Sequence, residues 1–397
     1  MKKLQTKRFI IVGPSGVGKS TLIKMILQIF INMRLAVSCT TRALRKSESD
    51  GVHYFKWSWF RFTLYRLFGK FAETDHHHGK WYGTLHSQAS IGTTSTIFDV
   101  DVNGALNLQK LFPDAVTIFI HPPKNDPEEL RNRLEQRAAK GDGDYSEIDK
   151  RVKRYEYEKT KADFFKYQLT NDNLFTCFAQ FAFIIYKELG GTVIAIDGTA
   201  GCGKGTHAKN LASEFGGIHL DSGLLYRAVA RYCQLVCGIM PGSESMQKVL
   251  DDAIRNYQEV QVDELLLRAP EVNAIVASWS CLQPVRDAVF MLQMKIAYGT
   301  NGTIVVAEGR DMTTHIFRWA QYRFFIDCPI EMRAERRAAQ YGQTKEDTFM
   351  ALTKRDQDDM GRALHPLYYD EADGVIKIMS DSPKEETFSK LKQRILI

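Results

Sequence analysis

Two glycine-rich segments of the 397-residue chain have the residue types and spacing that bind phosphate. The first, GPSGVGKS, fits the pattern GxxxxGK(S/T). Its glycines let backbone N–H groups face a phosphate, its lysine can reach the β- and γ-phosphates, and its hydroxyl can hold Mg²⁺. We therefore predict that a nucleoside triphosphate is bound by Gly13, Gly16, Gly18, Lys19, Ser20 and Thr21.

The second segment, GTAGCGKGT, is a variant of the same pattern. Glycine occupies the hydroxyl position, and the hydroxyl comes one residue later. This GKGT form is typical of nucleotide kinases that act on small acceptors, in which the metal is held more by phosphates and water than by protein. The predicted ATP-binding residues are Gly198, Gly201, Gly203, Lys204, Gly205 and Thr206.

Each loop lies where a strand-like run meets a helix-forming stretch. Residues 9–12 and 192–196 are rich in β-branched or aromatic side chains, and four further runs are strand-like, at 95–100, 115–120, 303–307 and 323–327. Polar, helix-forming stretches separate them, at 127–140, 146–162, 331–340 and 345–361. Strands that alternate with helices predict an α/β fold with parallel sheets, and ligands in such sheets lie at the carboxyl ends of the strands.

Length and spacing predict two domains. The two loops lie about 185 residues apart, which is a domain length rather than a repeat period. An apolar stretch at 174–186 closes the first half, and Gly190-Gly191 is the plausible hinge. We therefore expect domains at 1–189 and 190–397. With 44% hydrophobic and 25% charged residues, the composition excludes a disordered or fibrous chain.

The charge is unevenly distributed. Residues 1–189 carry 29 Lys and Arg against 20 Asp and Glu, whereas residues 190–397 carry 24 against 27. A basic half could bind nucleic acid or an anionic membrane, but small phosphorylated substrates also need cations. We expect no nucleic acid polymer, no membrane and no obligate protein partner. Seven cysteines without a CxxC pair indicate reduced thiols and a cytoplasmic location.

Polar residues dispersed through the first half carry a family resemblance. They occur in the runs SCTTRALR, YGT and DVDVNGA, with Glu48, Gly51, Tyr54 and Glu73 between the first two runs. Together they resemble guanylate kinase, nearly throughout residues 7–188. This implies a parallel sheet flanked by helices, with a lid segment and a nucleoside monophosphate-binding segment.

The resemblance also implies a role for each matching residue. Arg42, Arg45, Tyr54 and Tyr82 would bind the phosphate of GMP, since guanidinium forks and phenol hydroxyls suit a dianion. Glu73, Ser38 and Thr84 would read guanine, with Asp101 near the base. Ser20 and Asp99 would lie at the metal. The implied catalytic residues are Lys19 and the lid arginines Arg133, Arg137 and Arg151.

The second half resembles bacterial cytidylate kinase across residues 192–385. The runs that carry this likeness are HLDSGLLYR, VR, EGRDM, EMRAERR and KRDQDDMGR, in that order. The CMP phosphate would be bound by Arg227, Arg310, Arg355 and Arg362, and cytosine would be read by Ser278, Arg286 and Asp311. Asp359 would contact the ribose, and Ser222 belongs to the same CMP site. The implied catalytic residues are Lys204, Arg333 and Arg337.

The resemblances predict two tandem P-loop NTPase domains in one bifunctional nucleoside monophosphate kinase. ATP and Mg²⁺ would serve both domains, with GMP as acceptor in the first and CMP or dCMP in the second. One alternative is a guanylate-kinase-like scaffold module that binds protein ligands; the intact Lys19, Arg42 and Glu73 argue against it. Another alternative is one active kinase with a regulatory twin, which predicts activity with a single acceptor.

Two further segments have ambiguous patterns. Residues 57–68 mix aromatic and basic side chains, as nucleic-acid-binding or membrane-interfacial segments do. Phe60, Leu64, Leu67 and Phe68 fall at helical spacing, so we expect this face of a helix to pack on the core of the first domain. The triplet at 76–78 is His-His-His and could bind a metal, but a solvent loop is the favoured reading.

Overall fold

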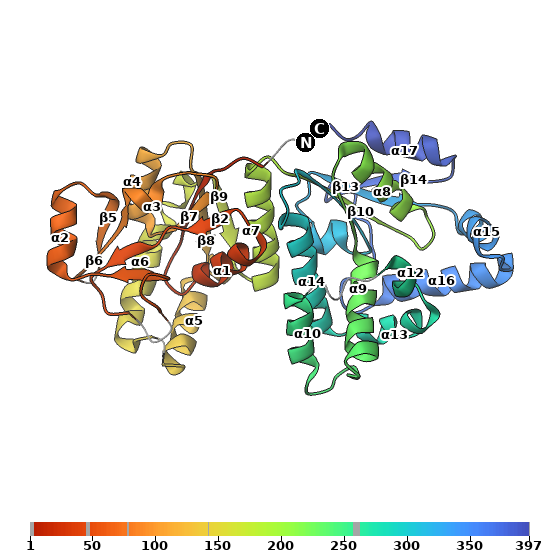
Figure 1. The fold of residues 1–397 in the computed structure, drawn as a ribbon, viewed down its shortest axis with the longest axis horizontal. Coiled ribbons are helices and arrows are strands. Elements are labelled where there is room, and N and C mark those ends of the chain that lie inside the picture. The colour runs from red at the N-terminus through yellow and green to blue at the C-terminus, as the bar shows by residue number, and fades with distance from the viewer. Residues whose placement is uncertain (1–3, 45–47, 78, 142, 257–262, 397) are drawn as a thin grey trace. The chain divides into compact units, whose positions relative to one another are not determined.

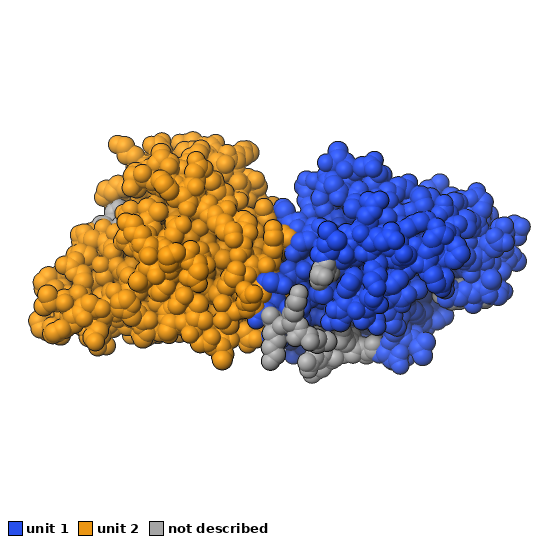
Figure 2. All heavy atoms as spheres, turned by 90° about the horizontal axis from the view of Figure 1, so that it is seen from above, with its two compact units in different colours: residues 1–4, 190–397 blue, residues 5–189 orange. Residues whose placement is uncertain are grey.

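The computed structural model describes residues 4–44, 48–77, 79–141, 143–256 and 263–396. The chain divides into two compact units, one of which is Gln5–Leu189 and the other of which is built on Gly190–Ile397 (Figures 1 and 2). In chain order, the first unit is Gln5–Leu189, drawn in orange in Figure 2, and the second unit is the one built on Gly190–Ile397, drawn in blue.

The first unit is built on a parallel sheet of five strands in the order β2-β7-β1-β8-β9. Its strands are β2 (Met33–Leu35), β7 (Ser95–Asp99), β1 (Arg8–Val12), β8 (Val116–His121) and β9 (Tyr167–Thr170). The central strand β1 is apolar and almost wholly buried, with Ile10 and Val12 in the same core as Phe98 and Phe119. Such continuous burial is what parallel strands covered on both faces require.

Helices follow most strands of this sheet (Figure 1). They are α1 (Lys19–Ile29), α3 (His86–Ala89), α4 (Val102–Leu111), α5 (Pro127–Ala139), α6 (Ile148–Lys159) and α7 (Leu174–Glu188), with short turns η1 (Pro123–Asn125), η2 (Tyr145–Glu147) and η3 (Ala162–Phe164). Polar caps set several starts. Asp126 accepts from the Glu128 N–H before α5, and Asn173 accepts from the Thr176 N–H before α7.

A second, smaller sheet of the first unit has the order β4-β3-β6-β5. Its strands are β3 (Ser38–Thr40), β4 (Tyr54–Lys56), β5 (Phe71–His77) and β6 (Lys80–Leu85), and α2 (Trp59–Leu67) lies beside them. Because side chains alternate along a strand, the sheet has two different faces. Cys39, Phe55 and Trp81 cluster with Phe62 of α2. The alternate residues of the same strands face the other way.

The structure corrects the prediction for helix α2. Phe62 is its buried residue, whereas Phe60 is 72% exposed, Leu67 80% and Phe68 66%, and Leu64 is exposed as well. The predicted core-packing face therefore points outward, because α2 carries apolar residues on both sides and the other side is the one that packs.

The prediction of a solvent loop at 76–78 is also wrong in part. His76 and His77 belong to strand β5, and the His76 ring lies 4.7 Å from that of Trp81. His78 lies outside the described residues. Within the part of the chain that the structure describes, no cluster of three or more His, Cys, Asp or Glu side chains could hold a metal ion.

The second unit has a parallel sheet of five strands in the order β11-β12-β10-β13-β14. The strands are β11 (Ile218–Asp221), β12 (Ile304–Glu308), β10 (Thr192–Gly198), β13 (Tyr322–Asp327) and β14 (Ile376–Met379). Its core contains Ile194 and Ile196 of β10, Val306 of β12 and Phe324 of β13.

The helices of this unit fall into three groups along the chain. After β10 and β11 come α8 (Lys204–Phe215), α9 (Ser222–Arg231), η4 (Tyr232–Val236), α10 (Met246–Arg255), α12 (Glu264–Leu267), α13 (Pro270–Ser280) and α14 (Gln283–Tyr298). The turn η5 (Met312–Ile316) follows β12. After β13 come α15 (Ile330–Tyr341), α16 (Lys345–Gly361) and, at the end, α17 (Lys384–Lys392).

The observed architecture confirms the predicted α/β class with a parallel sheet in each half. Each phosphate-binding loop follows the central strand of its sheet, β1 or β10. Over the described residues, none of the helices has the length and apolar character needed to cross a membrane.

Candidate active sites

The two glycine-rich loops have the same construction. Each leaves the central strand of a sheet and ends at the start of a helix, α1 or α8. Gly13 and Gly198 have φ angles of 145° and 159°, and a side chain on either would collide with the carbonyl of a neighbouring strand, at Ile120 and Ile326 respectively. Each loop is therefore held against the adjacent strand at a point where only glycine fits.

In the first unit, the predicted metal pair lies beside the loop lysine. The Ser20 hydroxyl donates to Asp99 Oδ2 at 3.5 Å, and Lys19 Nζ lies 3.8 Å from Asp99 Oδ1. Lys19 Nζ also donates to the Gly13 carbonyl at 2.6 Å. Burial raises the pKa of the Asp99 carboxyl, although the Lys19 charge opposes this. A hydroxyl and a carboxylate oxygen at this point form a donor set suited to Mg²⁺.

In the second unit, Glu308 takes the place of Asp99, and sequence reasoning did not select it. In the parallel registers, Ile11 pairs with Asp99 and Ile196 pairs with Glu308, and each isoleucine lies two residues before the first glycine of its loop. A Cβ atom built on Gly205 would lie 2.6 Å from Glu308 Oε1. The glycine at the hydroxyl position thus makes room for the longer carboxylate. Strand register was the signal that could have revealed Glu308.

The loop lysine of the second unit has a more crowded, more cationic environment. Lys204 Nζ donates to the Thr199 carbonyl at 3.4 Å. Burial lowers the pKa of Lys204, and the positive charge of Arg310 lowers it further.

The residues predicted to bind the GMP phosphate meet on one face of the small sheet. Arg42 Nε donates to the Tyr82 hydroxyl at 3.1 Å, and the Arg42 guanidinium lies 5.3 Å from the centre of the Tyr54 ring. Glu48 accepts two hydrogen bonds from Arg42, at 2.8 and 2.9 Å. Arg45 lies outside the described residues. Arg42 is thus oriented by a carboxylate and stacked on a phenol ring.

The three residues predicted to read guanine form one hydrogen-bonded chain. The Thr84 hydroxyl donates to Glu73 Oε1 at 2.8 Å, and the Ser38 and Thr84 hydroxyls lie 2.9 Å apart. All three side chains are buried. Burial raises the pKa of Glu73 to about 7, with the Thr84 hydrogen bond opposing the shift and the Asp101 charge adding to it.

Asp101 lies at the start of α4, where it accepts from the Gly104 N–H at 2.8 Å. Its other oxygen accepts from Arg154 at 2.6 Å. Arg154 lies one turn of α6 beyond the predicted lid residue Arg151 and was missed because a run of charges on a helix does not show which cation faces inward.

The lid arginines of the first unit lie on α5 and α6. Arg133 donates to the carbonyls of Val17 and Asn171, at 3.2 and 2.7 Å, and Arg151 donates to the Ser15 hydroxyl at 3.3 Å. Arg137 lies one turn further along α5 than Arg133. Arg133 and Arg151 therefore reach the phosphate-binding loop or the segment beside it.

A cluster of cations surrounds the second loop. Burial lowers the pKa of Arg355 to about 10, and the positive charges of Arg310, Arg227 and Arg337 contribute to the shift. Burial and the charges of Arg268, Arg310 and Arg337 lower the pKa of Arg227 in the same way. We call Lys204, Arg227, Arg310, Arg337 and Arg355 the cation cluster. Mutual repulsion of this kind is relieved when an anion binds.

The residues predicted to read cytosine and ribose form an adjoining ion-pair network. Asp311 Oδ2 lies 3.1 Å from Arg286, 3.2 Å from His365 and 3.8 Å from Arg362. Burial raises the pKa of Asp311, but the His365 hydrogen bond and the arginine charges outweigh it, so the pKa is lowered. Asp359 lies 2.8 Å from Arg310 and 3.7 Å from Arg362, which links this network to the cation cluster.

Two other predicted CMP residues behave differently. Ser222 is buried at the start of α9 and accepts from Gln293 at 2.9 Å. Ser278 is exposed on α13, and its hydroxyl donates to the Ile275 carbonyl within the same helix rather than to Arg286 or Asp311. The structure therefore brings Arg286 and Asp311 together but leaves Ser278 bonded locally.

Arg333 links the lid helices to the second loop. Its guanidinium, 5% exposed, donates to the carbonyls of Ala200 and Cys328 and to Asp356, at 2.8, 2.8 and 2.6 Å. Asp356 in turn accepts from the Ala200 N–H at 2.8 Å. The hydrogen bonds of the Arg333 guanidinium thus hold α15 and α16 against the loop. Arg337, by contrast, belongs to the cation cluster.

Asp197 is a further functional residue that sequence reasoning missed. It is buried at the end of β10 and accepts from the N–H groups of Met312 and Thr313, at 3.0 and 2.7 Å, and from the Thr313 hydroxyl at 2.7 Å. Burial raises its pKa to about 6. Asp197 thus fixes the turn that presents Arg310 and Asp311. A carboxylate at the end of an apolar strand was the available signal.

Comparison with known proteins gives each unit a family. The guanylate kinase family model matches residues 5–188, and the cytidylate kinase family model matches residues 194–391. The guanylate kinase of Chlorobium luteolum is 39% identical over 166 residues, which cover 41% of this chain and 82% of the relative. That of Mycoplasma pneumoniae is 36% identical over 185 residues, covering 45% and 75%. A crystal structure of guanylate kinase from Anaplasma phagocytophilum matches with a TM-score of 0.38 and 24% identity, covering 48% of this chain and 88% of that one.

The fold and the two loops define a P-loop kinase, an ATP-dependent phosphotransferase of the nucleoside monophosphate kinase class. The chain belongs to the guanylate kinase family through its first unit and carries a cytidylate kinase family domain in its second.

Proposed function

We propose that the chain is a bifunctional nucleoside monophosphate kinase. Residues 1–189 transfer the γ-phosphate of ATP to GMP, and residues 190–397 transfer it to CMP or dCMP. The observation that carries this proposal is that each unit combines its own loop lysine with its own set of acceptor-binding cations. In the first unit these are Lys19 and Arg42, and in the second they are Lys204 and the cation cluster.

In the first unit, Arg42, Tyr54 and Tyr82 bind the GMP phosphate. Glu73, when ionised, accepts from the guanine N1–H and 2-amino groups. Ser38 and Thr84 donate toward O6, for which the Thr84 hydroxyl turns from Glu73 to the base. Adenine presents the opposite hydrogen-bonding pattern on this edge, so the buried carboxylate selects guanine. Lys19 and the lid arginines Arg133, Arg137 and Arg151 neutralise charge on the transferred group, which matters most in a loose transition state.

In the second unit, the cation cluster binds the CMP phosphate and the Asp311 network reads the base. Asp311 accepts from the cytosine 4-amino group beside Arg286, and Asp359 contacts the ribose. Lys204 and Arg337 neutralise the transferred group. In both units the acceptor phosphate is already anionic and acts as the nucleophile, so the reaction needs no general base. Closure of the lid excludes water and protects ATP from hydrolysis.

Mg²⁺, when bound with ATP, supplies neutralisation of charge on the β- and γ-phosphates. In the first unit, Ser20 and Asp99 provide the oxygen ligands, consistent with their separation of 3.5 Å. In the second unit, we assign the carboxylate role to Glu308, which lies at the equivalent register position and packs against Gly205.

A coupled assay of ADP release tests the proposal. GMP, CMP, dCMP, UMP and AMP are offered singly to the full-length protein with ATP and Mg²⁺. We expect turnover with GMP and with CMP or dCMP, and little with AMP. If folded protein released no ADP with GMP, the first unit would be a binding module rather than a kinase. Turnover with one acceptor alone would indicate a single active kinase with a regulatory twin.

A further inference from the structure

Helix α2 has an apolar outer face that nothing in the kinase mechanism uses. Its members are Trp59, Phe60, Leu64, Leu67 and Phe68, and we call this face the α2 ridge. The exposed fractions of these five side chains, in the same order, are 63%, 72%, 39%, 80% and 66%. At 100° per residue, Trp59, Phe60 and Leu67 lie within one arc of the helix, while the buried Phe62 lies on the other side. The ridge is thus a continuous stripe rather than scattered exposed residues.

The ridge is separated from the proposed GMP site by the small sheet. The face of that sheet that carries Cys39, Phe55 and Trp81 packs on the inner side of α2. Tyr82 and Thr84 alternate with these residues along β6 and lie on the opposite face. Figure 1 shows α2 at the outer edge of the first unit, beyond this sheet. A surface bound to the ridge would therefore leave the face with Tyr82 and Arg42 accessible.

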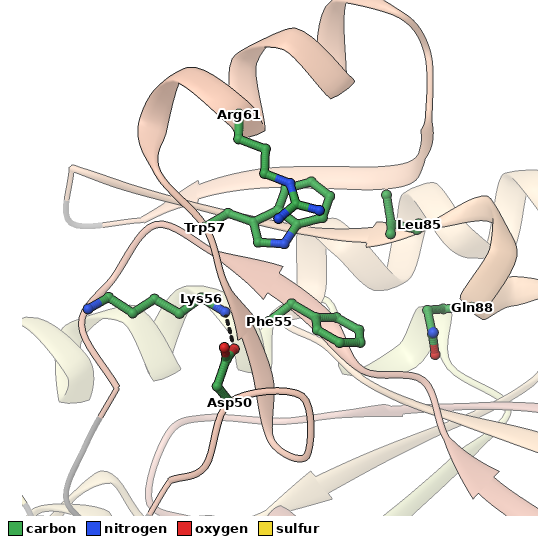
Figure 3. Close-up of a pocket in the computed structure, with 7 residues that line it drawn as sticks. All are labelled: Asp50, Phe55, Lys56, Trp57, Arg61, Leu85 and Gln88. Carbon is green, nitrogen blue, oxygen red and sulfur yellow. Dashed lines mark hydrogen bonds between the residues drawn. The ribbon is translucent and has the colours of Figure 1, made fainter.

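Cations outnumber exposed acids around the ridge, where the exposed acid Asp50 lines a hollow together with Lys56 and Arg61 (Figure 3). From Tyr54 to Leu85 the chain carries five Lys and Arg residues, all exposed: Lys56, Arg61, Arg66, Lys70 and Lys80. The two acids of this stretch are Glu73, which is buried, and Asp75, which is half-buried. The surface around the ridge is therefore strongly positive.

The two arginines of α2 lie against aromatic rings at its flanks. The Arg61 guanidinium lies 4.1 Å from the Trp57 ring centre and that of Arg66 lies 4.1 Å from the Trp81 ring centre. Figure 3 shows Arg61 over the Trp57 indole, while the side chain of Lys56 extends away from Phe55. The flanking charges thus lie beside the ridge, toward the base of the helix.

We propose that the α2 ridge docks on the surface of an anionic lipid bilayer. Trp59, Phe60 and Leu67 enter the boundary between headgroups and acyl chains, and the surrounding lysines and arginines face the lipid phosphates. An extended anionic surface suits this arrangement better than a localised acidic protein patch, because exposed cations lie on both flanks of α2 and directly before and after it in the chain. The proposal does not depend on the acceptor specificity of either unit, and it reverses the expectation from sequence that no membrane is involved.

Vesicle sedimentation with the full-length protein provides the test. The probes are vesicles of phosphatidylcholine alone and vesicles that also contain phosphatidylglycerol. We expect the protein to sediment with the anionic vesicles at a partition coefficient at least about tenfold higher than with neutral ones, and to be released by high salt.

The key variant is Phe60→Ser combined with Leu67→Ser. Both side chains are exposed, so the fold should persist, and we expect partitioning to fall by about a hundredfold because two large apolar groups no longer enter the lipid. The matched control is Ile31→Ser with Phe164→Ser, which replaces side chains of the same unit that are 65% and 60% exposed and lie outside the ridge. The control should partition like the unaltered protein. Thermal unfolding and ADP release with the unit's nucleotide acceptor should be the same for all three proteins.

Several results would overturn the proposal. These are failure of the unaltered protein to sediment with anionic vesicles, equal loss in the control, and retention of binding by the ridge variant. A concentration-dependent self-association that occurs without lipid and is abolished in the ridge variant would assign the ridge to a protein contact instead.

Discussion

The two phosphate-binding loops achieve the same arrangement with opposite choices of side chain. In the first unit, Ser20 follows the lysine and the neighbouring strand ends in the shorter carboxylate, Asp99. In the second unit, Gly205 follows the lysine and the equivalent strand position holds the longer Glu308. The departure of the second loop from the strict motif is therefore matched by a change on another strand, far away in the sequence.

The acceptor sites differ in how their cations are balanced. Arg42 of the first unit is paired with Glu48 and oriented by Tyr82. In the second unit, Arg227 and Arg355 repel other members of the cation cluster, and their pKa values are lowered. The first site is preorganised by an internal carboxylate, whereas the second combines an ion pair between Arg310 and Asp359 with repulsion among its buried cations, which a bound phosphate relieves. Similar chemistry is thus prepared in two electrostatic ways.

The largest expected effect comes from removing one loop lysine at a time. Lys19→Ala should lower GMP phosphorylation by about a thousandfold, because the lysine ammonium that neutralises negative charge on the transferred phosphoryl group is lost. CMP phosphorylation should stay within about twofold of the unaltered protein. Lys204→Ala should give the reverse pattern. Steady-state ADP release with each acceptor measures both.

Loss of both activities from a single lysine substitution, in protein whose thermal unfolding is unchanged, would contradict the independence of the two sites. Lys24→Ala serves as a matched control, since Lys24 is an exposed lysine on α1, one turn beyond the loop.

A smaller loss of activity is expected when the second loop is given the serine of the first, and a second substitution should reverse that loss. Gly205→Ser places a Cβ atom 2.6 Å from Glu308 Oε1, so we expect kcat/KM for CMP to fall by roughly ten- to a hundredfold. Combining it with Glu308→Asp shortens the carboxylate and should restore most of the loss. A double variant no better than Gly205→Ser would show that the two positions are not coupled.

The pH dependence of GMP binding should follow Glu73. Its pKa is raised by burial to about 7, so below that pH a growing fraction of the carboxyl is protonated and loses an acceptor for guanine. KM for GMP should rise about fivefold between pH 7 and pH 6 relative to that for CMP, because the ionised fraction of Glu73 falls by about that factor. Glu73→Gln should bind GMP weakly and abolish this pH dependence; persistence of the same profile in the variant would assign the titration to another group.

The smallest expected effect concerns stability in the first unit. Glu188 accepts from Lys7, Lys166 and Tyr167. Burial raises its pKa, but the hydrogen bonds outweigh burial and lower the pKa from its ordinary value of 4.5 to about 2. Glu188→Gln should cost about 1 kcal/mol at pH 7.

Because the folded pKa is depressed, this stabilisation is complete above pH 4.5 and fades as pH falls toward 2. The difference in melting temperature between Glu188→Gln and the unaltered protein should therefore shrink on acidification. A difference that grows at low pH would contradict the assignment.

Local patterns predicted the parts of the fold that local forces determine. The strands around each loop and the long polar helices were predicted correctly, including α16 at 345–361. The small sheet was not, because strands such as β3 and β4 have three residues each and no readable period. The buried side of α2 was misjudged because Phe60 and Phe62 are both apolar, and spacing alone does not show which stripe meets the core.

Within the sites, residues close to a motif were easier to find than residues that meet it in space. Lys19 and Arg42 lie in recognisable runs and Glu73 lies between two of them, and the structure places all three among polar partners. Glu308 and Asp197 act through strand register and backbone hydrogen bonds, which a single sequence does not display.

The most direct test of two independent kinase sites is the rate of ADP release with GMP and CMP present together, each at saturation, with ATP also saturating. Two sites predict a rate equal to the sum of the rates measured with each acceptor alone. A rate no higher than the larger of the two would mean that the acceptors compete for one site and would contradict the account.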